Sequence, residues 1–267
     1  VLTPAVFADN APPIISGLAD KTINEDASTN LTFSVTDSDT AAASIVITAS
    51  SSNTALVPNA NLTPGGSGAS TTLAITPTTD ANGTSTITVK ADDQAGGTST
   101  VTFVLTVSAV NDAPSFVLTT ATVSATEDTL TTVTGVATSI SEGGGSDESS
   151  QTVTFTVTPA DTTFFLIQPT VTTNGTLSFK AALNTNGTTT VSVKAVDTGG
   201  TLNGGVNQSA TQSLTIEVNA VNDAPVMAGL AAKTILEDAA STNLTFTVSD
   251  VDTAIASINI TASSSNT

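Results

Sequence analysis

The sequence predicts an all-β protein made of tandem β-sandwich domains, with about seven short strands in each domain. Three observations lead to this fold class. Apolar and polar residues alternate with a period of two, which is the pattern of a half-buried strand. Blocks of sequence recur at a spacing a little over one hundred residues, which indicates repeated domains. Turn motifs rich in Gly and Asn separate the alternating segments, and no segment shows a convincing helical period.

The alternating segments follow one another along two full repeats and the start of a third. Their apolar positions are Leu31, Phe33 and Val35; Ile45 and Ile47; Leu73 and Ile75; Ile87, Val89 and Ala91; Val101, Phe103, Leu105 and Val107; Val153, Phe155 and Val157; Val191, Val193 and Ala195; Leu214, Ile216 and Val218; and Leu244, Phe246 and Val248. The turn motifs between them are Pro64-Gly65-Gly66, Asn82-Gly83, Gly96-Gly97, Asn174-Gly175, Asn186-Gly187 and Gly199-Gly200. Short strands with one apolar and one Thr- or Ser-rich face are typical of a sandwich.

The repeats define the domain organisation. Val-Asn-Asp-Ala-Pro at 110–114 recurs at 221–225, and residues 28–54 match residues 241–267 with five differences. We therefore expect an N-terminal segment or linker at 1–8, repeats at 9–112 and 113–223, and a truncated third repeat at 224–267. Residues 1–8 have two readings, an ordinary linker or the end of a signal peptide. The third repeat belongs to a longer array or is completed by a strand from a neighbouring chain.

The composition excludes several classes of function. The chain has no Cys and no His, which rules out thiolate or imidazole zinc sites and Ser-His-Asp or Cys-His nucleophiles. Its formal net charge of −18 opposes binding to nucleic acids and to anionic lipid. No apolar run is long enough to span a bilayer. Only carboxylates remain for acid–base catalysis, and short repeated units do not form one cleft, so we expect no enzyme activity.

The acidic residues recur at four places in the repeats. Five Lys residues and no Arg cannot neutralise 23 acids. The recurring acids are Glu25-Asp26, Glu127-Asp128 and Glu237-Asp238; Asp37 and Asp39, Asp250 and Asp252, or a loop with Glu142, Asp147 and Glu148; Asp92-Asp93 and Asp197; and Asp9, Asp112 and Asp223 in the linkers. In a sandwich, loops gather at the two poles, so these acids can converge where repeats meet. Calcium takes six to eight oxygen ligands and suits such a cluster, whereas solvated surface acids are the alternative.

Four motifs, in this order, resemble cadherin repeats and their bacterial Ig-like relatives in large surface adhesins. The motifs are an early Glu, then Val-Thr-Asp-Ser-Asp at 35–39, Ile-Thr-Val-Lys-Ala-Asp-Asp-Gln-Ala-Gly-Gly at 87–97, and Val-Asn-Asp-Ala-Pro-Ser-Phe at 110–116. The resemblance implies a Greek-key sandwich with calcium at the linkers.

The resemblance also implies a set of metal ligands. The first junction would use Glu25, Asn111, Asp112, Asp147 and Asp197; the second Glu127, Asn222, Asp223, Asp250 and Asp252; and an N-terminal junction Asp37, Asp39 and Asp92, with Asp9 and Asn10. The family's acidic pair before the sixth strand is reduced to Asp80 in the first repeat, and Asn184 and Asn186 stand there in the second. Fewer ligands imply fewer ions and weak affinity, on the order of 10⁻⁴–10⁻³ M.

The sequence therefore favours a structural function. We expect a repeat region of an extracellular adhesin stalk or cell-surface filament, stiffened by Ca²⁺ at its linkers. Its expected partners are neighbouring repeats of the same chain and like chains in a filament, with no nucleic acid and no membrane insertion. The alternatives are a fibre subunit held by strand exchange and a module that binds a ligand or surface. The absence of Trp and Tyr argues against sugar binding, whereas Phe164-Phe165 is a candidate protein contact.

Overall fold

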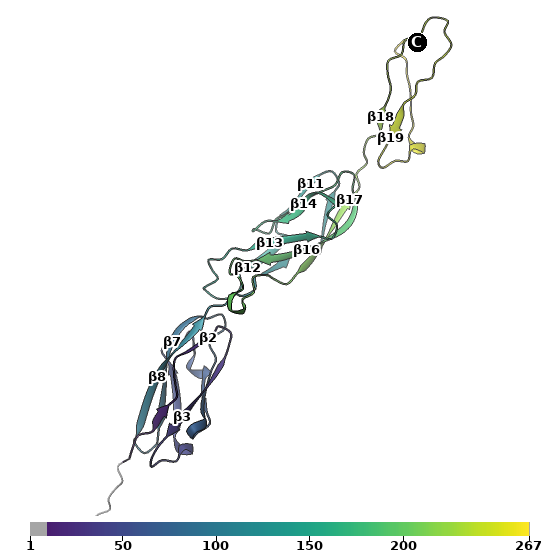
Figure 1. Cartoon of the computed structure of the whole chain (residues 1–267). Helices are drawn as coiled ribbons and strands as arrows, with labels where there is room; N and C mark the ends of the chain where they lie inside the picture. The colour runs from purple at the N-terminus through teal and green to yellow at the C-terminus, as the bar shows by residue number, and fades with distance from the viewer. Residues whose placement is uncertain (1–9, 267) are drawn as a thin grey trace, which may run out of the picture. The chain divides into compact units, whose positions relative to one another are not determined.

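The computed structural model describes residues 10–266 and contains strands and short 3-10 helices only (Figure 1). The strands are β1 (Ile14–Ser16), β2 (Lys21–Asn24), β3 (Thr29–Thr36), β4 (Val46–Ser51), β5 (Leu62–Gly65), β6 (Thr71–Ile75), β7 (Gly83–Asp92), β8 (Thr98–Ser108), β9 (Ser115–Leu118), β10 (Thr122–Thr126), β11 (Leu130–Val133), β12 (Ala137–Ser141), β13 (Thr154–Pro159), β14 (Phe165–Val171), β15 (Leu177–Ala181), β16 (Gly187–Val196), β17 (Gln212–Asn219), β18 (Val226–Ala228) and β19 (Thr247–Ser249). The 3-10 helices are η1 (Ala42–Ser44), η2 (Asn59–Asn61), η3 (Gly68–Ser70), η4 (Leu202–Gly204) and η5 (Ile255–Ser257). The predicted segment 1–8 and Asp9 lie outside the described residues.

The chain divides into two compact units whose limits cross the sequence repeats. The first unit comprises the segment up to Phe116 together with Ser139–Thr154 and Ala195–Ala210. The second comprises Val117–Thr138, Phe155–Lys194 and the segment from Thr211 onward. Each unit is described separately below.

The first repeat is a sandwich of two four-stranded sheets. One sheet has the order β1-β3-β6-β5 and the other β2-β8-β7-β4. All pairs are antiparallel except β2 and β8, which run parallel with Asn24 opposite Ser108. That pairing carries the end of β2 to the end of β8, where the linker begins.

The core of this sandwich comes from the alternating residues. Leu105 is fully buried in β8, whereas the preceding Val104 is 38% exposed, because successive side chains point to opposite faces of a sheet. The same alternation buries Phe33, Leu73, Ile87 and their neighbours between the two sheets. Most of the apolar positions that the alternation predicted in this repeat are buried, whereas Leu31, Ile47 and Val101 are only partly buried.

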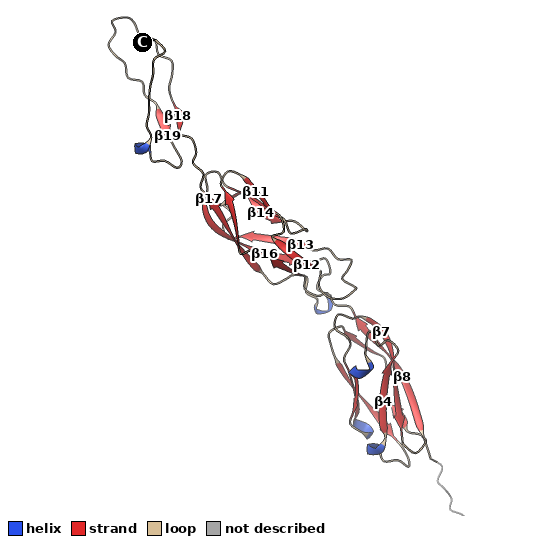
Figure 2. Cartoon of the chain, turned by 180° about the vertical axis from the view of Figure 1, so that it is seen from behind, coloured by secondary structure: helices blue, strands red, loops and turns tan. Residues whose placement is uncertain are grey.

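The second repeat also uses two main sheets, with the orders β10-β17-β16-β13 and β11-β15-β14. Leu177, Phe179, Val193 and Ile216 are at most 1% exposed and lie on the inward faces. A separate pair joins β9 and β12. Strands dominate the structure and the helical segments are single turns (Figure 2), so the all-β tandem sandwich predicted from the sequence is confirmed.

The start of the third repeat differs from the prediction. The alternation at Leu244, Phe246 and Val248 predicts a strand like β3, but only Thr247–Ser249 forms one, paired with β18. Phe246 is 38% exposed, whereas Phe33, its counterpart in the first repeat, is 3% exposed. β3 pairs with both β1 and β6, whereas within the described residues 224–266 β19 pairs with β18 alone.

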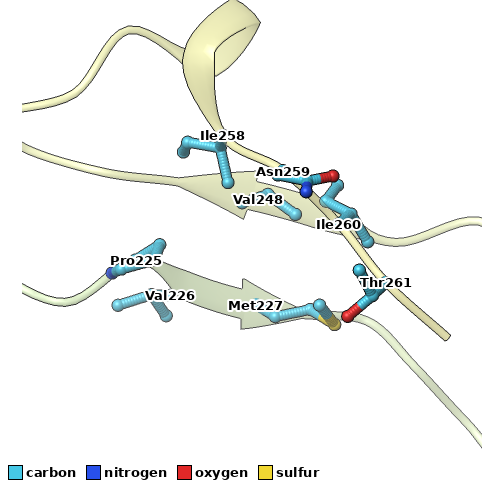
Figure 3. Close-up of a pocket in the computed structure, with 8 residues that line it drawn as sticks. All are labelled: Pro225, Val226, Met227, Val248, Ile258, Asn259, Ile260 and Thr261. Carbon is cyan, nitrogen blue, oxygen red and sulfur yellow. The ribbon is translucent and has the colours of Figure 1, made fainter.

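The open face of this segment is apolar. Its side chains line a shallow pocket between β18, β19 and the stretch that follows η5 (Figure 3): Pro225, Val226, Met227, Val248, Ile258, Asn259, Ile260 and Thr261. Met227 and Ile260 are each 48% exposed.

Two smaller features also differ from the sequence expectations. Pro64 and Gly65 lie in β5, and the predicted turn to β6 begins only at Gly66 (φ 68°); Pro64 is tolerated in β5 because this is an edge strand, where a Pro removes no required ladder hydrogen bond. The five 3-10 helices were not predicted. Within residues 10–266 none of the helical segments has the length or apolar character needed to cross a bilayer.

Candidate metal centre

The turn after β2 brings two carboxylates to the start of the linker. The Glu25 amide donates to Ser108 O (2.9 Å), and Glu25 Oε1 accepts a hydrogen bond from the Val110 amide (2.5 Å). Asp26 has a left-handed backbone (φ 58°), which Asp tolerates, and its Oδ1 accepts from the amide of Asp80 (3.0 Å). The parallel pairing of β2 with β8 thus places Glu25 and Asp26 beside the linker.

Asp26, Asp80 and Asp112 form the tightest group. One carboxylate oxygen from each lies within 4.8 Å of the others. Asp112 follows Asn111 in the linker, and its amide donates to Glu148 Oε1 (2.5 Å). Residues from three separate parts of the first unit therefore converge on one point.

A glycine-rich loop after β12 allows this approach. A Cβ at Gly144 would lie 2.5 Å from Asp80 Cγ and 2.6 Å from Asp112 Oδ2, so a larger residue there would displace these two carboxylates. The same loop carries Asp147 and Glu148, and Glu148 is only 2% exposed.

Asn111 and Asp197 complete this side of the linker. Asn111 Nδ2 donates to Val206 O (2.7 Å) and to Asp197 Oδ1 (3.2 Å), and Asn111 Oδ1 accepts from Gln151 Nε2 (2.8 Å). Asp197 is 5% exposed and also accepts the amide of Gly199 (2.9 Å). A cavity of about 240 Å³ lies beside them, lined by Ala109, Val110, Asn111, Asp147, Gln151, Gly199, Leu202 and Asn203.

These residues are called the first cluster below. Its acids are Glu25, Asp26, Asp80, Asp112, Asp147, Glu148 and Asp197. Burial raises the pKa of Glu25, Asp112 and Glu148 above the ordinary values, and repulsion from neighbouring carboxylates adds to the effect in each case. Hydrogen bonds from the linker amides oppose it at Glu25 and Glu148. Among the described residues, Lys90 and Asp92 form the one ion pair, so no cationic side chain neutralises this cluster.

The donor set of the first cluster fits a hard cation. Glu25 Oε2, Asp147 Oδ1 and Glu148 Oε2 are buried and have no hydrogen-bond donor. A buried charge without a partner is costly, and a cation among these oxygens would offset that cost. The available donors are carboxylate, amide and backbone oxygens, which are the ligands of calcium.

The second cluster lies entirely in the second unit and repeats the same contacts. Glu127 Oε1 accepts from the Val221 amide (2.7 Å), and Asp128 Oδ1 accepts from the amide of Asn184 (3.2 Å). The Asp223 amide donates to Asp252 Oδ2 (2.6 Å).

Carboxylates also crowd around Asp223. Its Oδ2 has no donor, and its pKa is raised by burial and then by repulsion from its acidic neighbours. Asp250 Oδ1 accepts the amides of Asp252 (3.0 Å) and Thr253 (2.7 Å), which fixes this loop beside the linker. Asn222 uses its Nδ2 on Asp223 O (2.8 Å).

A third group lies at the opposite pole of the first repeat. Asn10 Nδ2 donates to Asp93 Oδ2 (2.7 Å), and the amide of Ala11 donates to Asp39 Oδ2 (3.0 Å). The amide of Asp39 donates to Asp37 Oδ1 (3.0 Å), and hydrogen bonding with Asp39 lowers the pKa of Asp37.

Asp92 is not part of this third group. It lies at the end of β7 and pairs with Lys90 (3.0 Å), and this hydrogen bond lowers its pKa. Asp93 is 4% exposed and accepts the amides of Ala95 (2.7 Å) and Gly97 (2.9 Å). Sequence reasoning placed Asp92 at this junction, whereas Asp93 is the residue beside Asn10. The reason is the sheet alternation, which turns Asp92 outward.

The structure thus brings together all five predicted residues of the first junction and all five of the second. It adds residues that sequence reasoning did not assign to the sites: Asp26, Asp80, Glu148, Gln151, Asp128 and Asp93. Asp26 and Asp128 were visible in the Glu-Asp pairs. Glu148 was visible in the loop that replaces the Asp-x-Asp motif, but spacing did not select it over Asp147 because that loop differs in length from its counterparts.

The comparison with protein families matches the first repeat. Residues 10–106 match the family described as Bacterial Ig domain, so the resemblance to bacterial Ig-like repeats is confirmed for that part of the chain. No curated protein sequence matches the chain.

Solved structures of similar fold include the extracellular cadherin domains 1–5 of protocadherin gamma B2. This match has 16% identity and a TM-score of 0.47, and it covers 81% of this chain and 41% of the protocadherin chain. Drosophila N-cadherin EC1-4 has 16% identity and a TM-score of 0.47 over 80% of this chain and 50% of that chain. Human protocadherin-24 EC1-2 has 17% identity and a TM-score of 0.49, and the match covers 79% of this chain and 100% of that chain. The chain therefore spans half or less of the first two structures.

Proposed function

We propose that the chain is part of an extracellular adhesin stalk or cell-surface filament, in which Ca²⁺ bound at the linkers stiffens the array. The proposed repeats are 9–112, 113–223 and the start of a third at 224–267, preceded by residues 1–8. The chain would act as a structural element and not as an enzyme. The match of residues 10–106 to a bacterial Ig domain supports a structural repeat of this kind.

One observation carries the proposal. Glu25 and Glu148 are 5% and 2% exposed, each holds a linker amide with Oε1, and each leaves Oε2 buried without a donor. Solvated surface acids, the alternative reading, would have exposed oxygens. A divalent cation is the simplest partner for two such oxygens beside three clustered aspartates.

The ligands at the first junction would come from the first cluster and Asn111. Those at the second would come from Glu127, Asp128, Asp223, Asp250 and Asp252, with Asn222. The group of Asn10, Asp37, Asp39 and Asp93 would serve an N-terminal junction. Calcium would supply positive charge to each site, and the carboxylates would hold the linker amides in place.

The stiffening follows from linkage. A cation that binds only when Glu25 and Glu148 are in place stabilises the conformation in which they hold Val110 and Asp112. At a free calcium concentration 100 times the dissociation constant, the stabilisation is about 2.7 kcal/mol. Calcium would thereby restrict the linker without any new contact between side chains.

The test is thermal unfolding of the full chain in millimolar calcium, in chelator and in magnesium, all at one ionic strength. We expect calcium to raise the melting temperature well above the other two conditions, because magnesium prefers octahedral sites and keeps its waters. Equal melting in calcium, magnesium and chelator would overturn the calcium assignment, since screening alone acts in all three.

A second candidate is a fibre subunit held by strand exchange. The two-stranded sheet of β18 and β19 favours it, because its backbone edges can accept an added strand and the apolar side chains of Val226, Met227 and Ile260 are exposed beside them. Light scattering of the full chain in calcium buffer tests it. A monodisperse monomer would count against the fibre and leave the stalk.

A further inference from the structure

The first and second clusters are built from the same backbone contacts. In each, a Glu accepts the first linker amide, an Asp accepts an amide from the loop before the long central strand, and an acid accepts the second linker amide. The three pairs of hydrogen bonds are Val110 to Glu25 (2.5 Å) and Val221 to Glu127 (2.7 Å), Asp80 to Asp26 (3.0 Å) and Asn184 to Asp128 (3.2 Å), and Asp112 to Glu148 (2.5 Å) and Asp223 to Asp252 (2.6 Å).

The two clusters differ in charge at one matched position. Asp80 and Asn184 have the same left-handed backbone, with φ of 54° and 52°, and each donates its amide to the matched aspartate. The Asp80 carboxylate lies within 4.8 Å of those of Asp26 and Asp112. Asn184 supplies a neutral amide in its place, so this position lacks one negative charge in the second cluster.

The first cluster also has more buried carboxylate oxygens without a hydrogen-bond donor than the second cluster. Glu25 and Glu148 are more than nine-tenths buried and leave Oε2 without a donor in the first cluster. In the second cluster Glu127 is equally buried, and among the described residues Asp223 Oδ2 is the one buried carboxylate oxygen of that cluster without a donor, against three in the first cluster. The first cluster therefore has the greater unmet demand for positive charge.

We infer that the two linkers fill in order, the first at lower calcium than the second, and that Asp80 contributes to this difference. The inference rests on the proposed calcium function and adds an order of filling to it. Affinity for calcium in oxygen sites rises with the number of charged ligands. At this matched position the extra carboxylate of Asp80 should lower the calcium concentration for half-saturation of the first linker by about tenfold, the order expected from Coulomb attraction to a divalent ion in a solvated site. Over a range of calcium, the first linker would be ordered while the second stays free.

The experiment is hydrogen exchange of the full chain, read by mass spectrometry, across a series of free calcium concentrations. Peptides covering 109–113 and 220–224 report the linker amides that the two clusters hold. We expect protection at 109–113 to reach half its maximum at about tenfold lower calcium than at 220–224.

Substitutions then assign the cause. Asn184→Asp should lower the midpoint of the second linker about tenfold and leave the first unchanged. Asp80→Asn should raise the midpoint of the first linker by a similar factor. Asn174→Asp, which adds the same charge in an exposed turn away from both clusters, is the control and should move neither midpoint.

The outcomes separate the two ideas. Protection of both linkers at one calcium concentration, or of the second before the first, would overturn the order of filling and leave the calcium function intact. An unchanged second midpoint in Asn184→Asp would overturn the role of Asp80. If neither linker gains protection, the proposed function fails together with this inference.

Discussion

Replacing Glu148 with Gln should stabilise the chain in chelator and destabilise it in calcium. Glu148 Oε1 accepts the Asp112 amide, and Oε2 is buried with no donor among carboxylates that raise its pKa after burial itself. A Gln keeps an oxygen for Asp112, removes the buried charge and places an N–H group among acceptors. The same change removes a charged oxygen from the proposed cation site.

The magnitudes follow from these contacts. Leaving a buried acceptor unsatisfied costs about 1–3 kcal/mol, and charge repulsion adds to this cost, so we expect Glu148→Gln to gain about 1 kcal/mol in chelator. For a domain near 100 residues this raises the melting temperature by about 4–8 °C. In calcium at 100 times the dissociation constant, the native chain gains about 2.7 kcal/mol that the variant largely loses. In calcium, the free energy of unfolding of the variant should therefore be about 1–2 kcal/mol below that of the native chain, and the variant should melt at a lower temperature.

The assay is differential scanning calorimetry of both chains in chelator and in calcium. Glu217→Gln is the matched control, because Glu217 is exposed on β17, away from the clusters, and its substitution should change stability by less than about 0.5 kcal/mol in either condition. A Glu148→Gln effect of the same sign with and without calcium would refute the reasoning.

Three further predictions test the electrostatics and the packing. In chelator, the melting temperature should fall as pH rises from about 4.5 to 7. The reason is that the first-cluster acids with raised pKa values keep their protons in the folded state at pH values where the unfolded chain has lost them. A melting temperature that stays flat or rises over this range, measured by calorimetry, would contradict the prediction. Leu105→Ala should lower the free energy of unfolding by about 2–5 kcal/mol, because Leu105 is fully buried. Val104→Ala, at a position that is 38% exposed in the same strand, should lower it much less. Equal losses, measured by chemical denaturation, would argue against the sheet faces described. Asp93→Asn should destabilise the first unit by about 1–3 kcal/mol, because Asp93 is buried and its Oδ2 accepts a hydrogen bond from Asn10 Nδ2, which the NH₂ group of an Asn cannot accept. Asp92→Asn should stay within about 0.5 kcal/mol, and thermal melts that rank the two variants the other way would contradict the assignment.

Much of the candidate site was predictable because repeats place equivalent residues at equivalent poles. Glu25 and Glu127 occupy matched turns, and the linker residues that they hold, Val110 and Val221, begin the same five-residue motif. Spacing therefore identified both ends of this contact. It also identified Asp112 and Asp223, which follow in that motif.

Other parts of the site depended on geometry that spacing does not encode. Asp80 belongs to the first cluster because Asp26 holds its amide across 54 residues of sequence. Glu148 takes the place that Asp252 has in the second cluster, although its loop has a different length and sequence. Which member of the Asp92-Asp93 pair turns inward was decided by the strand before it.

By itself, the sequence determined the period-two pattern, the repeat length, the acidic poles and the absence of His and Cys, because these are properties of residue order and type. The tertiary structure alone decided whether a segment becomes a buried strand. Leu-Thr-Phe-Ser-Val at 31–35 and Leu-Thr-Phe-Thr-Val at 244–248 are nearly the same, yet Phe33 is 3% exposed and Phe246 38%. The first pairs with β6 within a four-stranded sheet, whereas among the described residues the strand that follows Phe246 pairs with β18 alone. A strand gains its stability from the ladder and the apolar surface opposite it, and those belong to other parts of the fold.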